Sequence, residues 1–126
     1  MLKMVVMIKR KEGISRAEFR DYYETSHCKL MQHFEDCIID YRRSYPVPEL
    51  VDAGTVYNPS GAEPPDPDNQ HFDCVTEVWL KSEDALRTLY ARMAEPELAA
   101  IFLDDTKRFT DRSQTRFVIC HEHQGL

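Results

Sequence analysis

The chain has 126 residues, of which 42% are hydrophobic and 30% charged, and its formal net charge is −6. This length predicts one domain, 1–126, and the composition is that of an ordinary globular protein. The negative charge argues against nucleic acid as a partner, because phosphate-binding surfaces concentrate Lys and Arg.

The N-terminal stretch MLKMVVMIKRKEG is too short and too basic for a signal peptide or a membrane span, since Lys3 interrupts it. Four cysteines are scattered without a Cys-x-x-Cys pair, which favours reduced thiols over disulfides. We therefore expect a cytoplasmic protein that has no membrane partner.

The first elements are a strand at 2–9 and a helix at about 16–33. Ser15 and Glu18 form a capping-box pattern at the helix start, after a break at Gly13. The helix has an apolar stripe at three- and four-residue spacing, formed by Phe19, Tyr22, Tyr23, Leu30 and Met31. His27 lies on the flank of this stripe.

A second strand is expected at 37–45, CIIDYRRSY. Strand geometry predicts one face formed by Cys37, Ile39, Tyr41, Arg43 and Tyr45. The segment that follows, 46–70, contains six of the seven prolines. A loop of this length in a small domain is usually functional or mobile, so we interpret it as an extended arm or a lid.

The third strand is expected at 71–81, with Phe72, Cys74, Thr76, Val78 and Leu80 on one face and Asp73, Val75, Glu77 and Trp79 on the other. Ser82 is expected to cap a second helix, whose buried stripe is Leu86, Leu89, Tyr90 and Met93. Pro96 suits the first turn of a further short helix, with Leu98, Ile101 and Phe102 packing inward. The last strand is expected at 115–123.

This order predicts an α+β, ferredoxin-like βαββαβ fold with an extra short helix and a four-stranded antiparallel sheet that has its helices on one side. The other face is predicted to hold Trp79 and Tyr41 among charged residues, which is too apolar for bare solvent. A second copy would cover it, so we expect a homodimer in which two sheets close into an α+β barrel with a cavity inside.

Three segments, MVVMIKRKEGISRAEFRDYYETSHCKL, FDCVTEVWLKSEDAL and DDTKRFTDRSQTRF, resemble the EthD-like family of dimeric α+β barrel proteins. The resemblance covers nearly the whole chain apart from the proline-rich loop. Its motifs are a basic run after the first strand, the His-x-x-Leu of His27 and Leu30, and the Glu-x-Trp of Glu77 and Trp79.

The resemblance implies a fold more specifically than a reaction. The family and its close structural relatives include aromatic-polyketide decarboxylases, muconolactone-type isomerases and proteins of unassigned activity linked to ether degradation. In the related isomerases a histidine late in the first helix and a tyrosine on the second strand do the work, and His27 and Tyr41 stand in matching places. The chain departs from the family at Cys74, where a glycine is frequent, and near Tyr45, where a polar residue or histidine is common.

His27 and Tyr41 are the candidate catalytic residues. Imidazole can accept and return a proton near neutral pH, and a tyrosine hydroxyl can donate a hydrogen bond to a developing oxyanion or enolate. Spacing alone favours a structural interpretation, namely a histidine packed at a helix edge and a half-buried strand tyrosine, and it is the resemblance that favours His27 as a site residue.

Four further residues are candidates for substrate binding: Arg43, Tyr45, Asp73 and Trp79. Arg43 can hold a carboxylate with two parallel hydrogen bonds, although an exposed salt bridge is the simpler interpretation. Asp73 is expected to line the cavity mouth and orient His27 or act as a base, or else to cap the turn before the third strand. Trp79 is interpreted mainly as an apolar wall at the barrel interface, together with Glu77.

We expect no metal and no cofactor. His121 and His123 lie two residues apart, but a metal site needs a third ligand. The chain has no glycine-rich phosphate loop, nucleophile elbow or nucleotide fingerprint.

The leading hypothesis is a cofactor-independent enzyme that acts on an aromatic, polycyclic or unsaturated-lactone substrate as a decarboxylase, dehydratase or isomerase. Two alternatives stay open: a non-catalytic accessory or ligand-binding protein, and a cofactor-independent monooxygenase.

Overall fold

The computed structural model describes residues 1–50 and 72–126. Four strands form one antiparallel sheet in the order β2-β3-β1-β4. The strands are β1 (Leu2–Ile8), β2 (Ile38–Ser44), β3 (Cys74–Leu80) and β4 (Arg116–His121). The central pair, β1 and β3, is therefore flanked by the strands that end each half of the chain.

Three α-helices and three 3₁₀ helices connect the strands in the described ranges. The α-helices are α1 (Arg16–Thr25), α3 (Glu83–Met93) and α4 (Pro96–Phe109). The 3₁₀ helices are η1 (His27–Phe34), η2 (Pro48–Leu50) and η4 (Arg112–Gln114).

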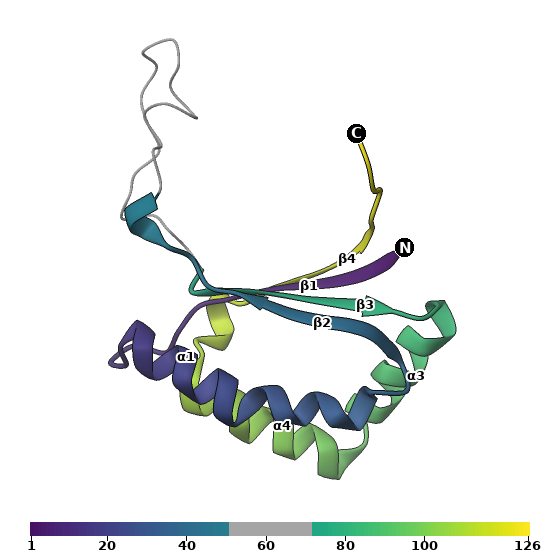
Figure 1. Ribbon diagram of the computed structural model, residues 1–126. Helices are drawn as coiled ribbons and strands as arrows, with labels where there is room; N and C mark the ends of the chain where they lie inside the picture. The colour runs from purple at the N-terminus through teal and green to yellow at the C-terminus, as the bar shows by residue number, and fades with distance from the viewer. Residues whose placement is uncertain (51–71) are drawn as a thin grey trace.

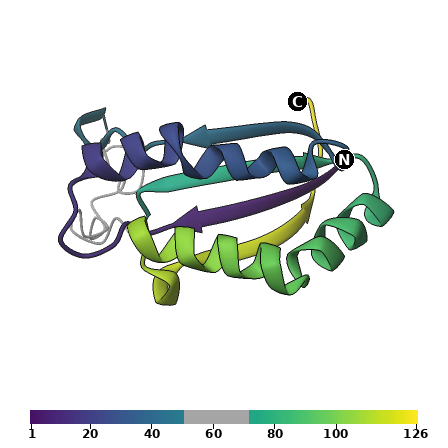
Figure 2. The same cartoon turned by 90° about the horizontal axis from the view of Figure 1, so that it is seen from below.

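The α-helices lie together against one face of the sheet, with α1 and α4 running side by side across it (Figures 1 and 2). The strand order and the two βαβ halves are those of a ferredoxin-like α+β fold, so the predicted fold class is confirmed. The opposite face of the sheet carries no described α-helix (Figure 1).

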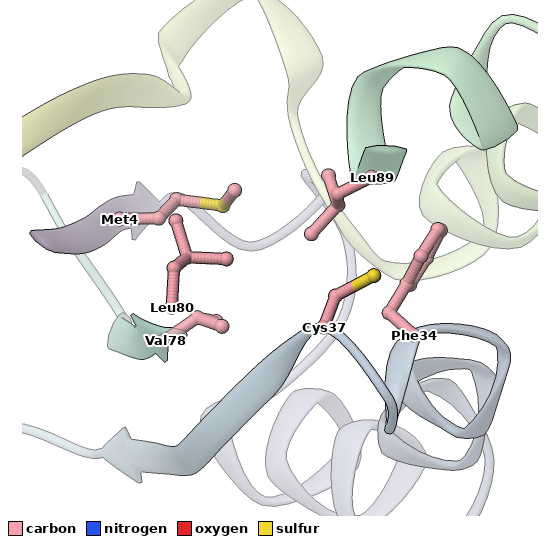
Figure 3. Close-up of a cluster of buried hydrophobic side chains, with 6 residues drawn as sticks. All are labelled: Met4, Phe34, Cys37, Val78, Leu80 and Leu89. Atoms are coloured by element: carbon pink, nitrogen blue, oxygen red, sulfur yellow. The ribbon is translucent and has the colours of Figure 1, made fainter. Parts of the chain in front are cut away.

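Buried and half-buried residues alternate strictly along β3, and this alternation determines which face of the sheet packs against the helices. Cys74, Thr76, Val78 and Leu80 are buried, and the residues between them are only half-buried. Because successive strand residues point to opposite faces, this pattern directs one face of β3 toward the helices. Val78 and Leu80 pack there with Met4, Phe34, Cys37 and Leu89 to form one core cluster (Figure 3).

The helix starts follow the predicted capping residues. The Ser15 side chain accepts a hydrogen bond from the backbone N–H of Glu18, and the Ser82 side chain accepts one from Ala85. Each serine thereby satisfies a backbone donor that has no partner within its helix.

The first helix is not continuous to residue 33, as the sequence predicted. α1 ends at Thr25, the backbone of Ser26 is non-helical, and His27 begins the separate 3₁₀ helix η1. The change in winding rotates the side chains that follow. His27 consequently packs inward against the rings of Tyr23 and Phe109 instead of lying on the flank of the stripe.

The predicted face of β2 is wrong at its start, because the register shifts between Ile38 and Asp40. Ile39, which was expected to share a face with Tyr41, is 56% exposed. Tyr41 pairs with Val78 and packs on the helix side, whereas Trp79 pairs with Asp40 on the open side. The prediction that Tyr41 and Trp79 share the open face is therefore also wrong.

The second half contains a longer helix than expected. α4 has 14 residues, so the predicted short extra helix is wrong in length. Leu98 and Phe102 pack inward as predicted, but Ile101 is exposed, and on α3 Tyr90 is exposed as well.

Three remaining expectations concern the loop, the cysteines and the membrane. The proline-rich loop, 46–70, falls for the most part outside the described residues, which include only its start with η2. All four cysteines are free. No helix within the described ranges is long and apolar enough to cross a membrane.

Candidate active site

A cavity of about 450 Å³ lies between the sheet and the helical layer. Its walls are mostly apolar side chains, and its polar groups come from His27, three tyrosines, four threonines and Arg112. This volume falls within the range of small-molecule sites, which typically combine apolar walls with a few polar groups. The cavity lies inside one chain, whereas the sequence analysis placed it inside a barrel made by two copies.

His27 and Asp105 form a hydrogen-bonded pair at the wall of this cavity. The Nδ1 atom of His27 lies 2.5 Å from Oδ2 of Asp105, and the Tyr22 hydroxyl donates to the other carboxylate oxygen at 2.6 Å. Three aromatic rings, those of Tyr23, Phe102 and Phe109, surround the imidazole. Because Asp105 occupies Nδ1, the nitrogen left for a ligand is Nε2, which has no hydrogen-bond partner among the described residues.

The surroundings of His27 favour the neutral imidazole. Burial lowers the pKa of His27 below its ordinary value of 6.5, and the carboxylate of Asp105 opposes this effect only in part. A neutral ring that donates its Nδ1 proton to Asp105 keeps a lone pair on Nε2. His27 is therefore in the form of a base near neutral pH.

A chain of hydroxyl groups lies on the sheet side of the cavity. Tyr41 donates a hydrogen bond to the hydroxyl of Tyr23 at 2.9 Å, and Tyr23 is bonded to the Thr76 hydroxyl at 2.6 Å. Burial raises the pKa of Tyr23 to about 12 and the pKa of Tyr41 well above its ordinary range. Both phenols thus stay protonated and can donate hydrogen bonds. The structure brings Tyr41 and His27 to the same cavity.

Arg43 and Tyr45 lie outside the cavity and converge on Glu24. The guanidinium of Arg43 donates two hydrogen bonds of 2.7 Å to this carboxylate, and the Tyr45 hydroxyl donates one of 2.5 Å. Arg43 also lies over the ring of Tyr41, 4.7 Å from its centroid. The guanidinium of Arg43 therefore already forms a salt bridge within the chain. This was the simpler of the two interpretations of Arg43 in the sequence analysis.

Asp73 is buried at the end of the sheet and does not orient His27. Its carboxylate accepts a 2.8 Å hydrogen bond from the backbone N–H of Arg10. The side chains of Lys9, Arg10 and Arg16 lie 3.6–3.8 Å from it. The expectation that Asp73 orients His27 is wrong, because the carboxylate at His27 is that of Asp105.

Trp79 lies on the open face of the sheet, opposite the cavity. Its indole N–H donates to Glu122 at 2.7 Å, and the cations of Lys3 and Arg42 lie over its ring. Lys3 also bridges Glu77 and Glu122 at 2.8 Å each. These residues form a charged network around one aromatic side chain.

The histidine pair near the C-terminus is divided by the end of a strand. β4 ends at His121, so His123 lies beyond it and the two do not share a strand face. Within residues 1–50 and 72–126, no group of three or more His, Cys, Asp or Glu side chains is placed to hold a metal ion.

The EthD domain model matches residues 11–113 of the chain. The chain belongs to the EthD domain family. None of the curated protein sequences compared with it gives a match.

Solved structures of low sequence identity share the fold of this EthD domain. An ethyl tert-butyl ether D (EthD) family protein from Bacillus halodurans is 15% identical, with a TM-score of 0.61 over 98% of this chain and 99% of that chain. A protein from Arabidopsis thaliana is also 15% identical, with a TM-score of 0.61 over 100% and 99%. HapK from Hahella chejuensis is 8% identical, with a TM-score of 0.59 over 99% and 95%. At these identities the likeness shows the fold alone.

The sequence analysis missed the carboxylate of Asp105 beside His27 and the contact made by the cavity hydroxyl of Thr76. Asp105 is 78 residues from His27 and lies on α4, where an acidic residue usually indicates a solvated face. Thr76 was assigned correctly to the buried face of its strand, but its hydroxyl partner Tyr23 comes from a distant helix. A buried threonine in an otherwise apolar strand face is the one signal that pointed to a polar contact there.

Proposed function

We propose that this EthD domain is a cofactor-independent enzyme that moves a proton on a small, largely apolar substrate. The substrate class is an aromatic, polycyclic or unsaturated-lactone compound, and the reaction is a decarboxylation, a dehydration or an isomerisation. The observation that carries the proposal is the contact between His27 and Asp105 at the wall of an apolar cavity.

In this proposal His27 takes a proton from the substrate through Nε2. Asp105 holds the ring in the tautomer that leaves this nitrogen free, and its negative charge stabilises the imidazolium that forms. In an isomerisation His27 then returns the proton to another carbon of the enolate, and in a dehydration it gives the proton to the departing hydroxyl group, which leaves as water. In a decarboxylation the proton comes from the carboxyl group of the substrate, CO₂ leaves, and the resulting carbanion takes the proton back from His27. Decarboxylation, dehydration and isomerisation all pass through a stabilised enolate or carbanion, so the same pair serves each of them.

Tyr41 would stabilise the negative charge of the enolate. Its hydroxyl hydrogen now points to Tyr23, and rotation about the C–O bond redirects it to a substrate oxygen in the cavity. Since burial keeps Tyr41 protonated, it acts as a donor and not as a base. The neighbouring Tyr23 and Thr76 hydroxyls hold the phenol in place.

Exchange of carbon-bound hydrogen with solvent tests proton abstraction without knowledge of the final product. The purified protein is incubated in D₂O with a panel of hydroxy-aromatic acids and unsaturated lactones, and loss of ¹H signals is followed by NMR. We expect exchange with at least one compound, and we expect His27→Gln to abolish it while that compound still binds.

The matched control is His33→Gln, because His33 is an exposed histidine at the end of the same 3₁₀ helix. This variant should exchange at the wild-type rate. If exchange survives in His27→Gln, the assignment of His27 as the base is wrong.

The rival function is ligand binding without catalysis. It is favoured by the same cavity, since the contacts of His27 with Asp105 and three aromatic rings also suit a purely structural histidine. Binding of panel compounds without exchange of any of them would support this rival.

A further inference from the structure

Arg112 is a cationic side chain in the wall of the cavity. It belongs to η4, the short turn between α4 and β4, and it lines the cavity together with Thr110, Thr115 and Phe117. Among the described residues its guanidinium has no ion-pair or hydrogen-bond partner. The cavity is therefore apolar inside and carries one arginine without a carboxylate.

Two other arginines near the helical layer and the sheet are paired differently. Arg43 is held by Glu24 with two hydrogen bonds of 2.7 Å, and Arg108 contacts Asp104 at 3.2 Å. The acidic residue next to Arg112 is Asp111, whose carboxylate accepts hydrogen bonds from Ser113 and Gln114. The carboxylate adjacent to Arg112 in the sequence is thus occupied by its own turn.

Arg112 lies at the mouth of the cavity. It is exposed, and so are Tyr90 and Phe117, which also line the cavity and whose rings lie 6.5 Å apart at their centroids. His27, by contrast, lies deeper, with 13% of its side chain exposed. An elongated ligand would place one end at Arg112 and its apolar body inside.

We propose that Arg112 binds a carboxylate of the substrate, so that the substrate class narrows to aromatic or unsaturated carboxylic acids. A planar guanidinium matches a carboxylate with two parallel hydrogen bonds, which gives the contact a defined geometry as well as a charge. The anchored carboxylate fixes the depth and direction of the ring, which presents a carbon to His27. This inference rests on the proposed function for the role of His27, but its binding step does not depend on catalysis.

The same contact gives the site its selectivity. A neutral lactone or amide of the same shape fills the cavity equally well but leaves the guanidinium without an anion. Arg112 therefore makes the site selective for acids over neutral compounds, whereas the apolar walls make it selective for ligand size.

The test compares two probes of the same shape, 1-hydroxy-2-naphthoate and its amide, by isothermal titration calorimetry. The protein is wild type, Arg112→Gln, Arg112→Lys or Arg20→Gln. Arg20 is an exposed arginine of α1 that does not line the cavity, so its variant has the same change of charge as Arg112→Gln.

In the wild type and in Arg20→Gln we expect the acid to bind at least about tenfold more tightly than the amide, as a charge-assisted hydrogen bond predicts. Arg112→Gln should remove this preference by weakening the acid alone, and Arg112→Lys should restore part of it. Circular dichroism establishes that each variant is folded.

Two results would overturn the inference: wild-type protein that binds the acid no more tightly than the amide, or Arg112→Gln that weakens both probes equally. Failure of the proposed function is distinguishable, because it leaves the preference for the acid intact while hydrogen exchange is absent. His27→Gln serves as the cross-check, since it should lose exchange and keep the preference.

Discussion

His27 is a histidine whose two ring nitrogens have different surroundings. Nδ1 faces Asp105, whereas Nε2 has no partner among the described residues, and the ring is enclosed by aromatic side chains. Burial alone would only make the ring a weaker base. The carboxylate partly restores its basicity and fixes its tautomer, which is why the pair matters more than the histidine itself.

Replacing Asp105 by Asn separates these effects at the scale of single residues. The amide keeps the shape but loses the charge that raises the pKa of His27, so we expect this pKa to fall further. We also expect proton exchange to slow by about tenfold to a hundredfold, a share of what a general base contributes. NMR titration of the His27 imidazole and the exchange rate in D₂O are the two measurements.

The control for this substitution is Asp104→Asn, because the neighbouring Asp104 is exposed and contacts Arg108. It should change neither the His27 pKa nor the exchange rate. A His27 pKa in Asp105→Asn equal to that of the wild type would contradict the electrostatic coupling.

At the scale of elements, Glu24 joins α1 to β2 beside the cavity. It accepts hydrogen bonds from Arg43 of β2 and from Tyr45, which directly follows this strand. The Arg43 guanidinium lowers the pKa of Glu24 from its ordinary 4.5 to about 2. The folded state thus binds a proton less readily than the unfolded state, so this interaction stabilises the fold above about pH 4.5 and is lost as the pH falls toward 2.

Glu24→Gln tests this contribution by urea denaturation between about pH 6 and pH 3. At the higher pH the variant should be less stable, by no more than about 1 kcal/mol because the carboxylate is partly exposed. At the lower pH the difference should shrink, because Glu24 of the unfolded wild type takes up a proton below about pH 4.5 while the folded protein does not yet do so. Glu35→Gln, an exposed substitution after η1, is the control, and a pH-independent difference for Glu24→Gln would count against the interpretation.

The elements that could be predicted are those that are determined by residues close together in the sequence. The alternation of β3 and the serine caps at Ser15 and Ser82 act within a few residues, and the structure has them as predicted. The register shift after Ile38 was missed because Ile38 and Ile39 both suit a buried strand face. The end of α1 at Thr25 was missed because the helical spacing of apolar residues resumes at Leu30 and Met31. A shift of one residue exchanges the two faces of a strand, which is why Tyr41 and Trp79 were assigned together.

The candidate site follows the same rule. The resemblance named His27 and Tyr41 together, and the structure brings both to one cavity, although the strand face predicted for Tyr41 was wrong. Two further polar residues of the site, Asp105 and Arg112, were not predictable. They come from the second half of the chain, and charged residues of this kind usually lie in solvent. Contacts between distant segments depend on how helices pack, and a pattern of apolar residues does not specify that at the level of single polar atoms.

At the scale of the whole molecule, the open face of the sheet leaves apolar groups uncovered among its charges. Val118 of β4 is 43% exposed and lies beside Val5 of β1, next to the network around Trp79. The acids and bases of that network are paired within the chain, so a second copy could cover them without leaving an unpaired charge. The homodimer stays a prediction, and this face is where we expect its interface.

Val118→Glu tests the interface and the independence of the cavity together. A charge on the open face at β4 should prevent pairing, so light scattering at micromolar concentration should give the mass of a dimer for the wild type and of a monomer for the variant. Leu103→Glu is the control, because Leu103 is an exposed apolar residue of α4 on the other side of the molecule.

Since the cavity lies within one chain, the monomeric variant should still bind the naphthoate probe with the wild-type preference for the acid. A monomeric wild type would contradict the dimer, and loss of probe binding in a folded monomer would mean that the partner completes the site.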